Sequence, residues 1–376
     1  MSTSTLPSVR TLSGAALCLL AACSSSSRRA PTGAAASAVQ SALNAASTTG
    51  PSNTWLVADS GERHLGRIRQ LTDGGENAEA YFSTDGQWLT FQSTRDGRRC
   101  DQQYVMRVDG SGLRRISAGG KTTCGYFYAS DTRVLFGSTH AVDSACPPRP
   151  PADAGYVWPL DKYDIWTVKP DGSDLRRLTD YGVYTAEAVL SPDGKRVVFT
   201  SVKDGDLDIY TMNIDGTNVK QLTRTPGYDG GPWWSPDGTK IVYRAQHPSD
   251  SASLARYRDL LSRGMIRPSE VELYVMNADG SDNRQVTRLG GANFGPSWTP
   301  DGQRIIFSSN HKNPRSRNFD LFLVNLDGTG LEQVTTNPDF DGFPMFSPDG
   351  KRLIWASNRH QSKFGETNLM ITEWIK

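Results

Sequence analysis

The chain has 376 residues, of which 36 are glycine and 21 are proline, and its formal net charge at pH 7 is +1. A charge this close to zero argues against a nucleic-acid-binding protein. The length alone suggests two domains, but a strong internal repeat indicates a single repetitive architecture instead.

Residues 1–22 have the pattern of a secretory signal peptide, with Arg10 before a short apolar segment from Thr11 to Ala22. Leu20-Ala21-Ala22-Cys23 resembles the lipobox of bacterial lipoproteins, which implies that Cys23 is lipidated and anchors the chain to a membrane. An ordinary signal peptide with a chance cysteine is the alternative. Residues 23–54 are rich in Ser and Ala and predict a flexible tether. We therefore expect an exported lipoprotein on the periplasmic side of the outer membrane or at the cell surface.

Three cysteines remain beyond the lipobox: Cys100, Cys124 and Cys146. Export favours disulfides, but three thiols can form only one bridge among themselves, and all three pairings stay open. Their spacing matches no zinc pattern, so a structural disulfide is favoured over a metal site.

A Ser-Pro-Asp-Gly motif and its variants recur six times along the chain. The copies begin at Ser83, Ala129, Ser191, Ser235, Thr299 and Ser347, which are 46, 62, 44, 64 and 48 residues apart. A period near 45 with several short strands in each unit is typical of a β-propeller, and two units carry insertions.

Each unit predicts four strands. The first ends at the Pro-Asp-Gly turn, the second is a β-branched and aromatic run, and the third ends at another Asp-Gly turn such as Asp215-Gly216. The sixth unit lacks its fourth strand, while Ile68 to Asp73 matches a fourth strand and precedes the first unit. We therefore predict an all-β, six-bladed β-propeller over residues 55–376, closed by the N-terminal strand in the last blade.

These repeats resemble the TolB-type, WD40-like propeller repeats, often called PD40, from about Leu65 to Lys376. The resemblance supports the propeller fold and a chain that binds an envelope protein or peptide. We expect no nucleic-acid partner and a monomeric propeller.

A second regularity marks candidate site residues. Four positions beyond the aromatic residue of each second strand, every unit has a cationic or titratable side chain: Arg95, His140, Lys203, His247, His311 and Arg359. The inter-blade loops add acidic residues: Glu79, Glu187, Asp229 and Asp341. One interpretation is a polar mouth for an anionic ligand, on the face opposite the Asp-Gly turns. The alternative is that these side chains stabilise their own turns.

No cofactor is indicated with certainty, but His140, His247 and His311 raise the hypothesis of a divalent metal, because imidazoles with carboxylates are competent ligands. Oligogalacturonate lyases are propellers with a histidine-rich metal site, and this resemblance implies a metal-dependent lyase or hydrolase acting on an anionic saccharide or peptide. No residue motif of those enzymes matches this chain.

Two insertions interrupt the repeat. Ala141 to Lys162 is proline-rich and predicts an extended excursion, whereas Pro248 to Glu270 predicts a short helix capped by Asp250 or Ser251. The helix is interpreted either as docked over the loops or as a lid. The aromatic residues beside the first strands are assigned to packing between blades rather than to a carbohydrate platform.

The sequence lacks several common catalytic motifs. A Gly-x-Ser-x-Gly elbow, a His-Glu-x-x-His zinc motif and the nucleotide-binding loops do not occur. A non-enzymatic binding or scaffolding module is therefore the first hypothesis, and the metal-dependent enzyme is the second.

Overall fold

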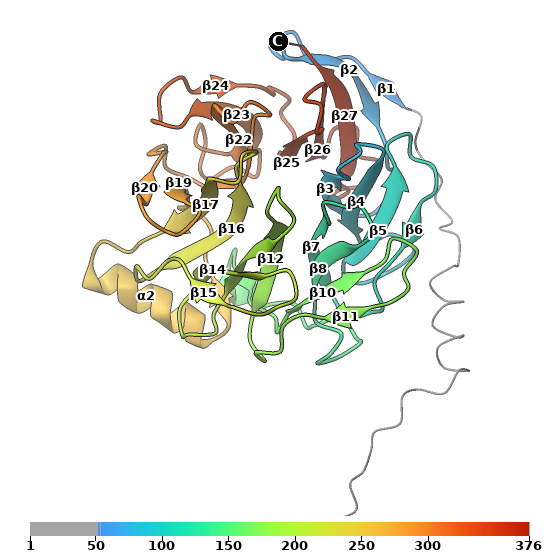
Figure 1. The fold of residues 1–376 in the computed structure, drawn as a ribbon. Helices are drawn as coiled ribbons and strands as arrows, with labels where there is room; N and C mark the ends of the chain where they lie inside the picture. Colours follow the sequence, from blue (N-terminus) through green and yellow to red (C-terminus); the bar gives the residue numbers. More distant parts are fainter. Residues whose placement is uncertain (1–51, 53, 376) are drawn as a thin grey trace, which may run out of the picture. The chain divides into compact units, whose positions relative to one another are not determined.

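The computed structural model describes residue 52 and residues 54–375. This part of the chain forms a six-bladed β-propeller, whose blades surround a central axis (Figure 1). The predicted signal peptide, Cys23 and nearly all of the predicted tether lie outside the described residues. Within that part, no helix has the length and apolar character needed to span a bilayer.

Each blade is one antiparallel sheet, and its first strand lies closest to the axis. Blade 1 contains β3 (Asn77–Phe82), β4 (Trp88–Ser93), β5 (Gln102–Arg107) and β6 (Arg114–Arg115). Blade 2 contains β7 (Thr122–Phe127), β8 (Val134–Ser138), β10 (Asp164–Val168) and β11 (Arg176–Arg177). Blade 3 contains β12 (Thr185–Leu190), β13 (Arg196–Ser201), β14 (Asp208–Asn213) and β15 (Lys220–Gln221).

The other three blades follow the same plan. Blade 4 contains β16 (Tyr228–Trp234), β17 (Lys240–Gln246), β19 (Glu272–Asn277) and β20 (Arg284–Gln285). Blade 5 contains β21 (Asn293–Trp298), β22 (Arg304–Ser309), β23 (Asp320–Asn325) and β24 (Glu332–Gln333). Blade 6 contains β25 (Asp341–Phe346), β26 (Arg352–Ser357), β27 (Asn368–Trp374) and β2 (Leu65–Gln70), with β1 (Trp55–Leu56) at its outer edge.

The predicted closure of the ring is confirmed. Strand β2 pairs antiparallel with β27, with Arg69 opposite Ile371, so a strand from the N-terminal part of the described chain completes the last blade. Strand β1 pairs with β2 and adds a fifth strand that the repeat did not predict. Closure satisfies the outer edge of β27 and joins the two ends of the propeller through backbone hydrogen bonds.

The Ser-Pro-Asp-Gly motifs form tight turns between the first and second strands. In the copy at Ser191, the Asp193 carboxylate accepts hydrogen bonds from Ser191 Oγ at 2.6 Å and from the Lys195 amide at 3.1 Å. Gly194 has φ +70°, a left-handed conformation that glycine adopts without steric cost. These hydrogen bonds lower the pKa of Asp193, so the motif aspartate has a structural role in the turn.

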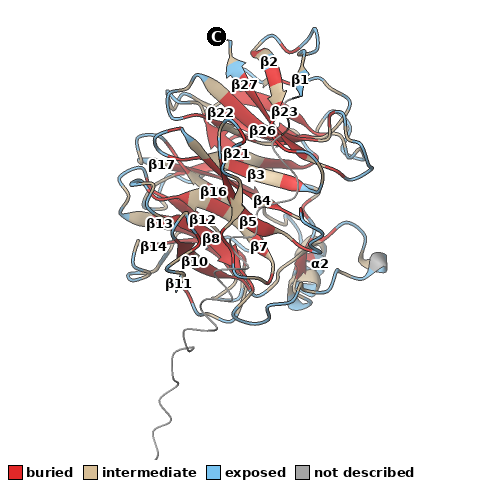
Figure 2. Ribbon diagram, turned by 90° about the vertical axis from the view of Figure 1, so that its right-hand side faces the viewer, coloured by how far each residue is buried: buried red, intermediate tan, exposed pale blue. Residues whose placement is uncertain are grey.

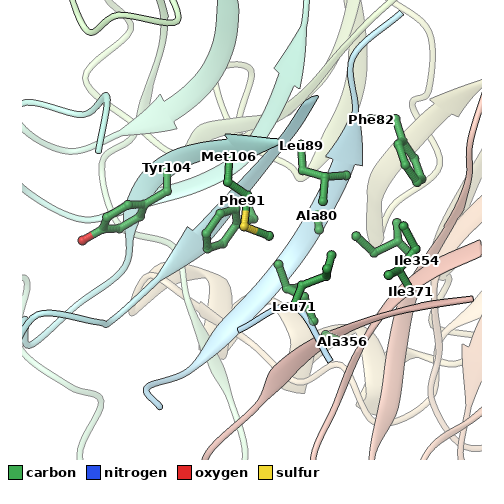
Figure 3. Packing of buried hydrophobic residues seen from close by; sticks show 11 residues of the cluster. Leu71, Ala80, Phe82, Leu89, Phe91, Tyr104, Met106, Ile354, Ala356 and Ile371 are labelled. Carbon is green, nitrogen blue, oxygen red and sulfur yellow. The ribbon is translucent and has the colours of Figure 1, made fainter. Parts of the chain in front are cut away.

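The hydrophobic core is divided among the spaces between neighbouring blades. Burial is concentrated in the strands, and the exposed residues lie mainly in the loops (Figure 2). Between blades 6 and 1, side chains of the two sheets interlock, including Leu89, Phe91, Ile354 and Ile371 (Figure 3). Strands that are covered on both faces explain the nearly continuous apolar runs of the second and third strands.

The two insertions pair with each other, pack against residues of blades 3, 4 and 5, and form what we call the arch, residues 141–162 and 248–270. Its strands β9 (Trp158–Pro159) and β18 (Met265–Ile266) pair antiparallel, and the first insertion also contains the 3-10 helix η1 (Ala152–Ala154). The predicted helix is confirmed as α2 (Ser251–Ser262), with Asp250 in a capping box, and its Tyr257 is buried against the propeller.

A disulfide joins the arch to blade 1. Cys100, in the loop after β4, is bonded to Cys146 in the first insertion, with a Cα–Cα distance of 5.7 Å. Cys124 is a free thiol and lies in β7, beside the axis.

Candidate functional site

The six side chains of the repeated cationic series occupy equivalent turns but do not come together. In five blades, the backbone amide of this position donates to a serine hydroxyl two residues earlier, as Arg95 does to Ser93 at 3.1 Å. The side chains then pack outward over aromatic residues of their own blade's second and third strands, as Lys203 does over Tyr210. The series is therefore mainly a structural device of each blade.

The three histidines proposed as metal ligands each have partners within their own blade. His140 Nδ1 lies 2.8 Å from Ser138 Oγ, and burial lowers its pKa to about 4. His311 Nδ1 lies 2.9 Å from Ser309 Oγ, and His247 Nε2 lies 2.9 Å from an Asp229 carboxylate oxygen. No group of three or more His, Cys, Asp or Glu side chains within residues 54–375 is placed to hold a metal ion. The geometry of the described chain thus gives the metal hypothesis no support.

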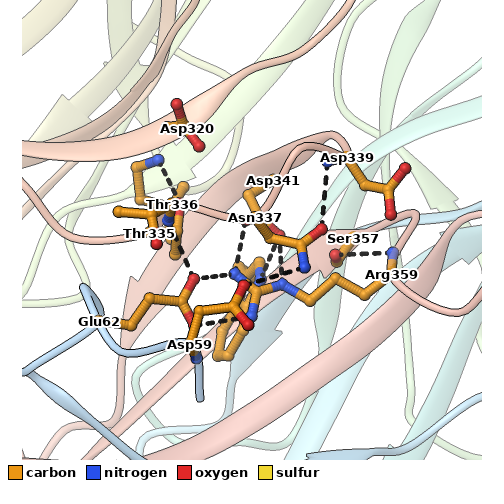
Figure 4. Close-up of polar contacts among 12 residues, drawn as sticks. Asp59, Glu62, Asp320, Thr335, Thr336, Asn337, Asp339, Asp341, Ser357 and Arg359 are labelled. Atoms are coloured by element: carbon orange, nitrogen blue, oxygen red, sulfur yellow. Dashed lines mark hydrogen bonds and ion pairs between the residues drawn. The ribbon is translucent and has the colours of Figure 1, made fainter.

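Arg359 and Asp341 belong to a buried network that fastens the N-terminal segment to blade 6 (Figure 4). Arg359 donates to Asp341 Oδ2 at 2.8 Å and to Glu62 Oε2 at 2.9 Å, and the three side chains are at most 3 % exposed. Glu62 also accepts the Thr336 amide at 3.0 Å. These two predicted site residues therefore stabilise the closure of the ring rather than a ligand site.

A second ring of residues surrounds the axis itself. Each innermost strand contains a β-bulge whose central residue has a positive φ between 51° and 59°. The six bulge residues, in blade order, are Glu79, Cys124, Glu187, Gly231, Gly295 and Phe343. Bulges redirect side chains and interrupt pairing, and here they line the central channel.

The two predicted acids Glu79 and Glu187 are bulge residues and lie in this channel. Each carboxylate accepts the bulge amide of the following blade: Glu79 Oε2 from Cys124 at 3.1 Å, and Glu187 Oε2 from Gly231 at 2.9 Å. Glu187 also forms an ion pair with Arg244, whose Nε donates to the Tyr228 hydroxyl at 2.6 Å. Burial, with a smaller contribution from Glu187, raises the pKa of Glu79 to about 7.

Three aromatic side chains meet in the channel one level further along the strands. The ring centroids of Tyr81 and Trp233 are 4.9 Å apart, and those of Tyr126 and Trp233 are 5.2 Å apart. They belong to the ring of residues two positions after the bulges, which we call the waist: Tyr81, Tyr126, Val189, Trp233, Ser297 and Met345.

The waist separates two cavities. The vestibule, of about 280 Å³, is ringed by the Ser-Pro turns and lined by aromatic, proline and hydroxyl side chains, and none of its described lining residues is charged. The inner chamber, of about 40 Å³, contains Glu79, Glu187 and Arg244. Tyr126, Val189, Trp233 and Ser297 line both cavities, so the two are neighbours along the axis.

The vestibule lies on the face of the Asp-Gly turns, whereas the sequence pattern placed the site on the opposite face. On that opposite face, the arch covers part of the channel end, because the ring of Trp158 lies 5.1 Å from the Arg244 guanidinium carbon. Trp158 also packs against Phe294 of blade 5, which fixes the arch above the inner chamber. The aromatic residues of the first strands thus serve both the packing between blades and the lining of the vestibule.

Sequence reasoning missed Arg244, although a usable signal was present. Directly after the aromatic residue of the second strand, the other five blades have Gln92, Gly137, Thr200, Ser308 and Ala356. A lone arginine at a position that is otherwise uncharged marks a special environment. The waist carried no such signal, because its members share neither size nor polarity.

The fold defines the class of the protein as a six-bladed β-propeller with a partly covered central channel. Residues 161–254 and 272–364 match the family model described as the TolB beta propeller domain, PD40. The chain is therefore a member of the TolB-like β-propeller repeat proteins. No protein of curated function has significant sequence similarity to it.

Solved structures share this fold at low sequence identity. A protein described as TolB from Agrobacterium tumefaciens is 18% identical, with a TM-score of 0.52 over 81% of this chain and 92% of that chain. TolB from Acinetobacter baumannii is 14% identical, with a TM-score of 0.50 over 81% and 65% of the two chains. An oligogalacturonate lyase in complex with manganese is 12% identical, with a TM-score of 0.51 over 88% and 98%. Likeness at this level shows the shared fold and leaves function open.

Proposed function

We propose that this protein is a binding module of the cell envelope that receives a segment of a protein or peptide partner in the vestibule. The observation that carries the proposal is the vestibule itself, an uncharged cavity of about 280 Å³ on a rigid ring of turns. Concave, mainly apolar sites with a few hydroxyl groups are typical of ligand recognition. The preformed ring would lower the entropic cost of binding.

Membrane attachment is part of the same proposal. The lipobox-like sequence would lipidate Cys23, and residues 24–53 would link the lipid to the propeller. Metabolic labelling with a fatty acid tests this step: label should enter the wild-type chain and be absent from Cys23→Ser, and equal labelling would contradict it.

Partner binding is tested by blocking the vestibule from its exposed rim. Ala129 lines the vestibule and is exposed, so Ala129→Trp should fill it without disturbing a core. With the full chain as bait in envelope extract, we expect a reproducible protein partner whose recovery falls at least about tenfold with Ala129→Trp. Ala145→Trp, at an exposed position of the arch, is the matched control. Equal recovery with Ala129→Trp would refute the vestibule as the binding site.

The metal-dependent lyase or hydrolase remains the alternative, but no contact in the described chain favours it. Its three histidines lie in separate blades, and each is paired locally. If the protein degraded polyuronides and a chelator abolished this activity, the binding-module proposal would be overturned in favour of an enzyme.

A further inference from the structure

The inner chamber carries more negative than positive charge. Glu187 and Arg244 neutralise each other as an ion pair. Among the described residues, Glu79 forms no ion pair, and its hydrogen-bond partner is Cys124, whose amide donates to Oε2 at 3.1 Å. The ionised chamber therefore has one carboxylate for which the protein provides no cation. Glu79 is partly buried, and withdrawing an uncompensated carboxylate from water is costly, so its presence requires an explanation.

The structural role of Glu79 does not require its charge. The Cys124 amide already has a second acceptor, Gln92 Oε1, at 3.1 Å. In blade 6, the equivalent bulge amide of Phe343 is satisfied by the neutral hydroxyl of Ser308 at 3.0 Å. A neutral side chain is thus sufficient to stabilise a bulge of this kind, and the carboxylate of Glu79 is free for another role.

The route from the vestibule to Glu79 suits an apolar stem that ends in a cation. The vestibule has no charged lining among the described residues, and the waist beyond it contains the aromatic rings of Tyr81, Tyr126 and Trp233. Aromatic faces attract ammonium groups, and a lysine has an aliphatic stem of four carbons before its charge. Glu79 lies two residues beyond Tyr81 on the same strand, about 7 Å along it, which is comparable to the length of that stem.

We propose that the inner chamber binds an ammonium group on an aliphatic stem, which passes from the vestibule through the waist beside Ser297 and pairs with Glu79. The shared chemistry is a primary amine, carried either by a lysine side chain of a partner or by a free alkylamine. This inference rests on the proposed function, because the vestibule is the entrance. It assigns specificity to the site: partners should carry a lysine at the segment that enters the vestibule.

Calorimetric titration of the full chain with n-pentylamine tests the proposal directly. We expect pentylamine to bind, and the isosteric alcohol 1-pentanol to bind at least about tenfold more weakly, because only the amine carries a charge for Glu79. Glu79→Gln keeps the size of the side chain and an acceptor oxygen, and should weaken pentylamine binding by about tenfold or more. Titration with a capped Gly-Gly-Lys-Gly-Gly peptide and with its Met counterpart distinguishes the two sources of the amine. Tighter binding of the Lys peptide would indicate a lysine side chain, whereas binding of pentylamine alone would indicate a free alkylamine.

Glu373→Gln, at an exposed position on β27, is the matched control and should bind pentylamine like the wild type. Thermal unfolding of both variants shows whether the fold is retained. Equal affinity for amine and alcohol, absence of amine binding by the wild type, or unchanged binding by Glu79→Gln would each overturn the inference. Partner capture that is lost with Ala129→Trp but unaffected by Glu79→Gln would overturn it as well, while the proposed function would stand.

Discussion

Two rings of structurally equivalent residues run around this propeller, and they differ in where their interaction partners lie. The outer ring, the cationic series of the second-strand turns, interacts mainly within single blades, as His311 does with Ser309 and Phe322. The inner ring, at the bulges, interacts across blades, as Glu187 does with Gly231 and Arg244. A repeated residue therefore indicates a repeated local role, whereas residues that break the repeat converge on the axis.

Arg359 and Arg95 show the same contrast within the outer ring. Arg359 pairs with Asp341 of its own blade and with Glu62 of the N-terminal segment. Arg95 is also buried, but its Nε and Nη2 atoms have no hydrogen-bond partner in the described chain, and burial lowers its pKa. One arginine connects two parts of the chain, whereas the other only packs over Phe91 and Tyr104.

The largest effect is therefore expected from Arg359→Met. The change leaves the carboxylates of Glu62 and Asp341 buried without a cation, which should lower the free energy of unfolding by about 3–5 kcal/mol. Arg95→Met is the matched comparison and should change it by about 1 kcal/mol or less, because no ion pair is lost. Denaturant unfolding measures both, and equal losses would remove the distinction between the two arginines.

Removing the disulfide tests whether the stability of the arch depends on its covalent bond to blade 1. Cys100 and Cys146 are 46 residues apart in the chain, so Cys146→Ser should cost about 2–4 kcal/mol of stability. Cys124→Ser changes a free thiol beside the axis and serves as the control, with a much smaller expected loss. Urea unfolding without reductant provides the comparison, and a small loss for Cys146→Ser would mean that β9 and β18 hold the arch unaided.

The titration of Glu79, in the inner ring, should make the stability of the folded chain depend on pH. Its pKa is raised from 4.5 to about 7 in the folded chain, so the folded state binds more protons than the unfolded state between these values. Stability contributed by this group is therefore full below about pH 4.5 and is lost as pH rises to about 7. The charged and titratable groups around it are Cys124, Glu187, Arg244 and Asp101.

Glu79→Gln removes that dependence. We compare the unfolding free energy of the variant with that of the wild type at each pH. This difference should be about 1–3 kcal/mol more favourable to the variant at pH 8 than at pH 4. Chemical unfolding at the two pH values measures the difference, with Glu373→Gln as the exposed control. A difference that does not change with pH would show that Glu79 titrates normally in the channel.

The smallest effect is expected from His140→Gln. Because its lowered pKa keeps the imidazole neutral near pH 7 and its contacts are local, we expect a stability change of about 1 kcal/mol or less. Metal analysis after incubation with excess Mn²⁺ or Zn²⁺ should give the same content for variant and wild type. A loss of bound metal in the variant would revive the metal hypothesis.

Much of the fold was predictable because a propeller is built from local signals. The turn motifs, the apolar strands and the displaced fourth strand at Ile68 predicted six blades and the closure between β2 and β27. Helix α2 was predicted from its cap at Asp250 and its apolar residues. Strand β1 was missed because it contributes only two paired residues and lies outside the repeat.

The candidate site was predictable only in part. Glu79 and Glu187 were predicted as acidic residues of the inter-blade loops at the mouth of the propeller, whereas the structure places both in innermost strands that line the channel. Their partner Arg244, the aromatic waist and the side of the vestibule were not predicted, because they depend on contacts between blades that are far apart in the sequence.

The sequence alone determined the number of blades and the structural role of the Ser-Pro-Asp-Gly turns, since these depend on patterns within about 45 residues. It also determined the closure of the ring, because the strand at Ile68 repeats the fourth-strand pattern, although its partner β27 lies at the other end of the described chain. Only the tertiary structure decided which polar residues meet. The physical reason is that convergence on an axis is a property of the closed ring: Glu79, Glu187 and Arg244 belong to three blades and share a cavity only after all six have packed.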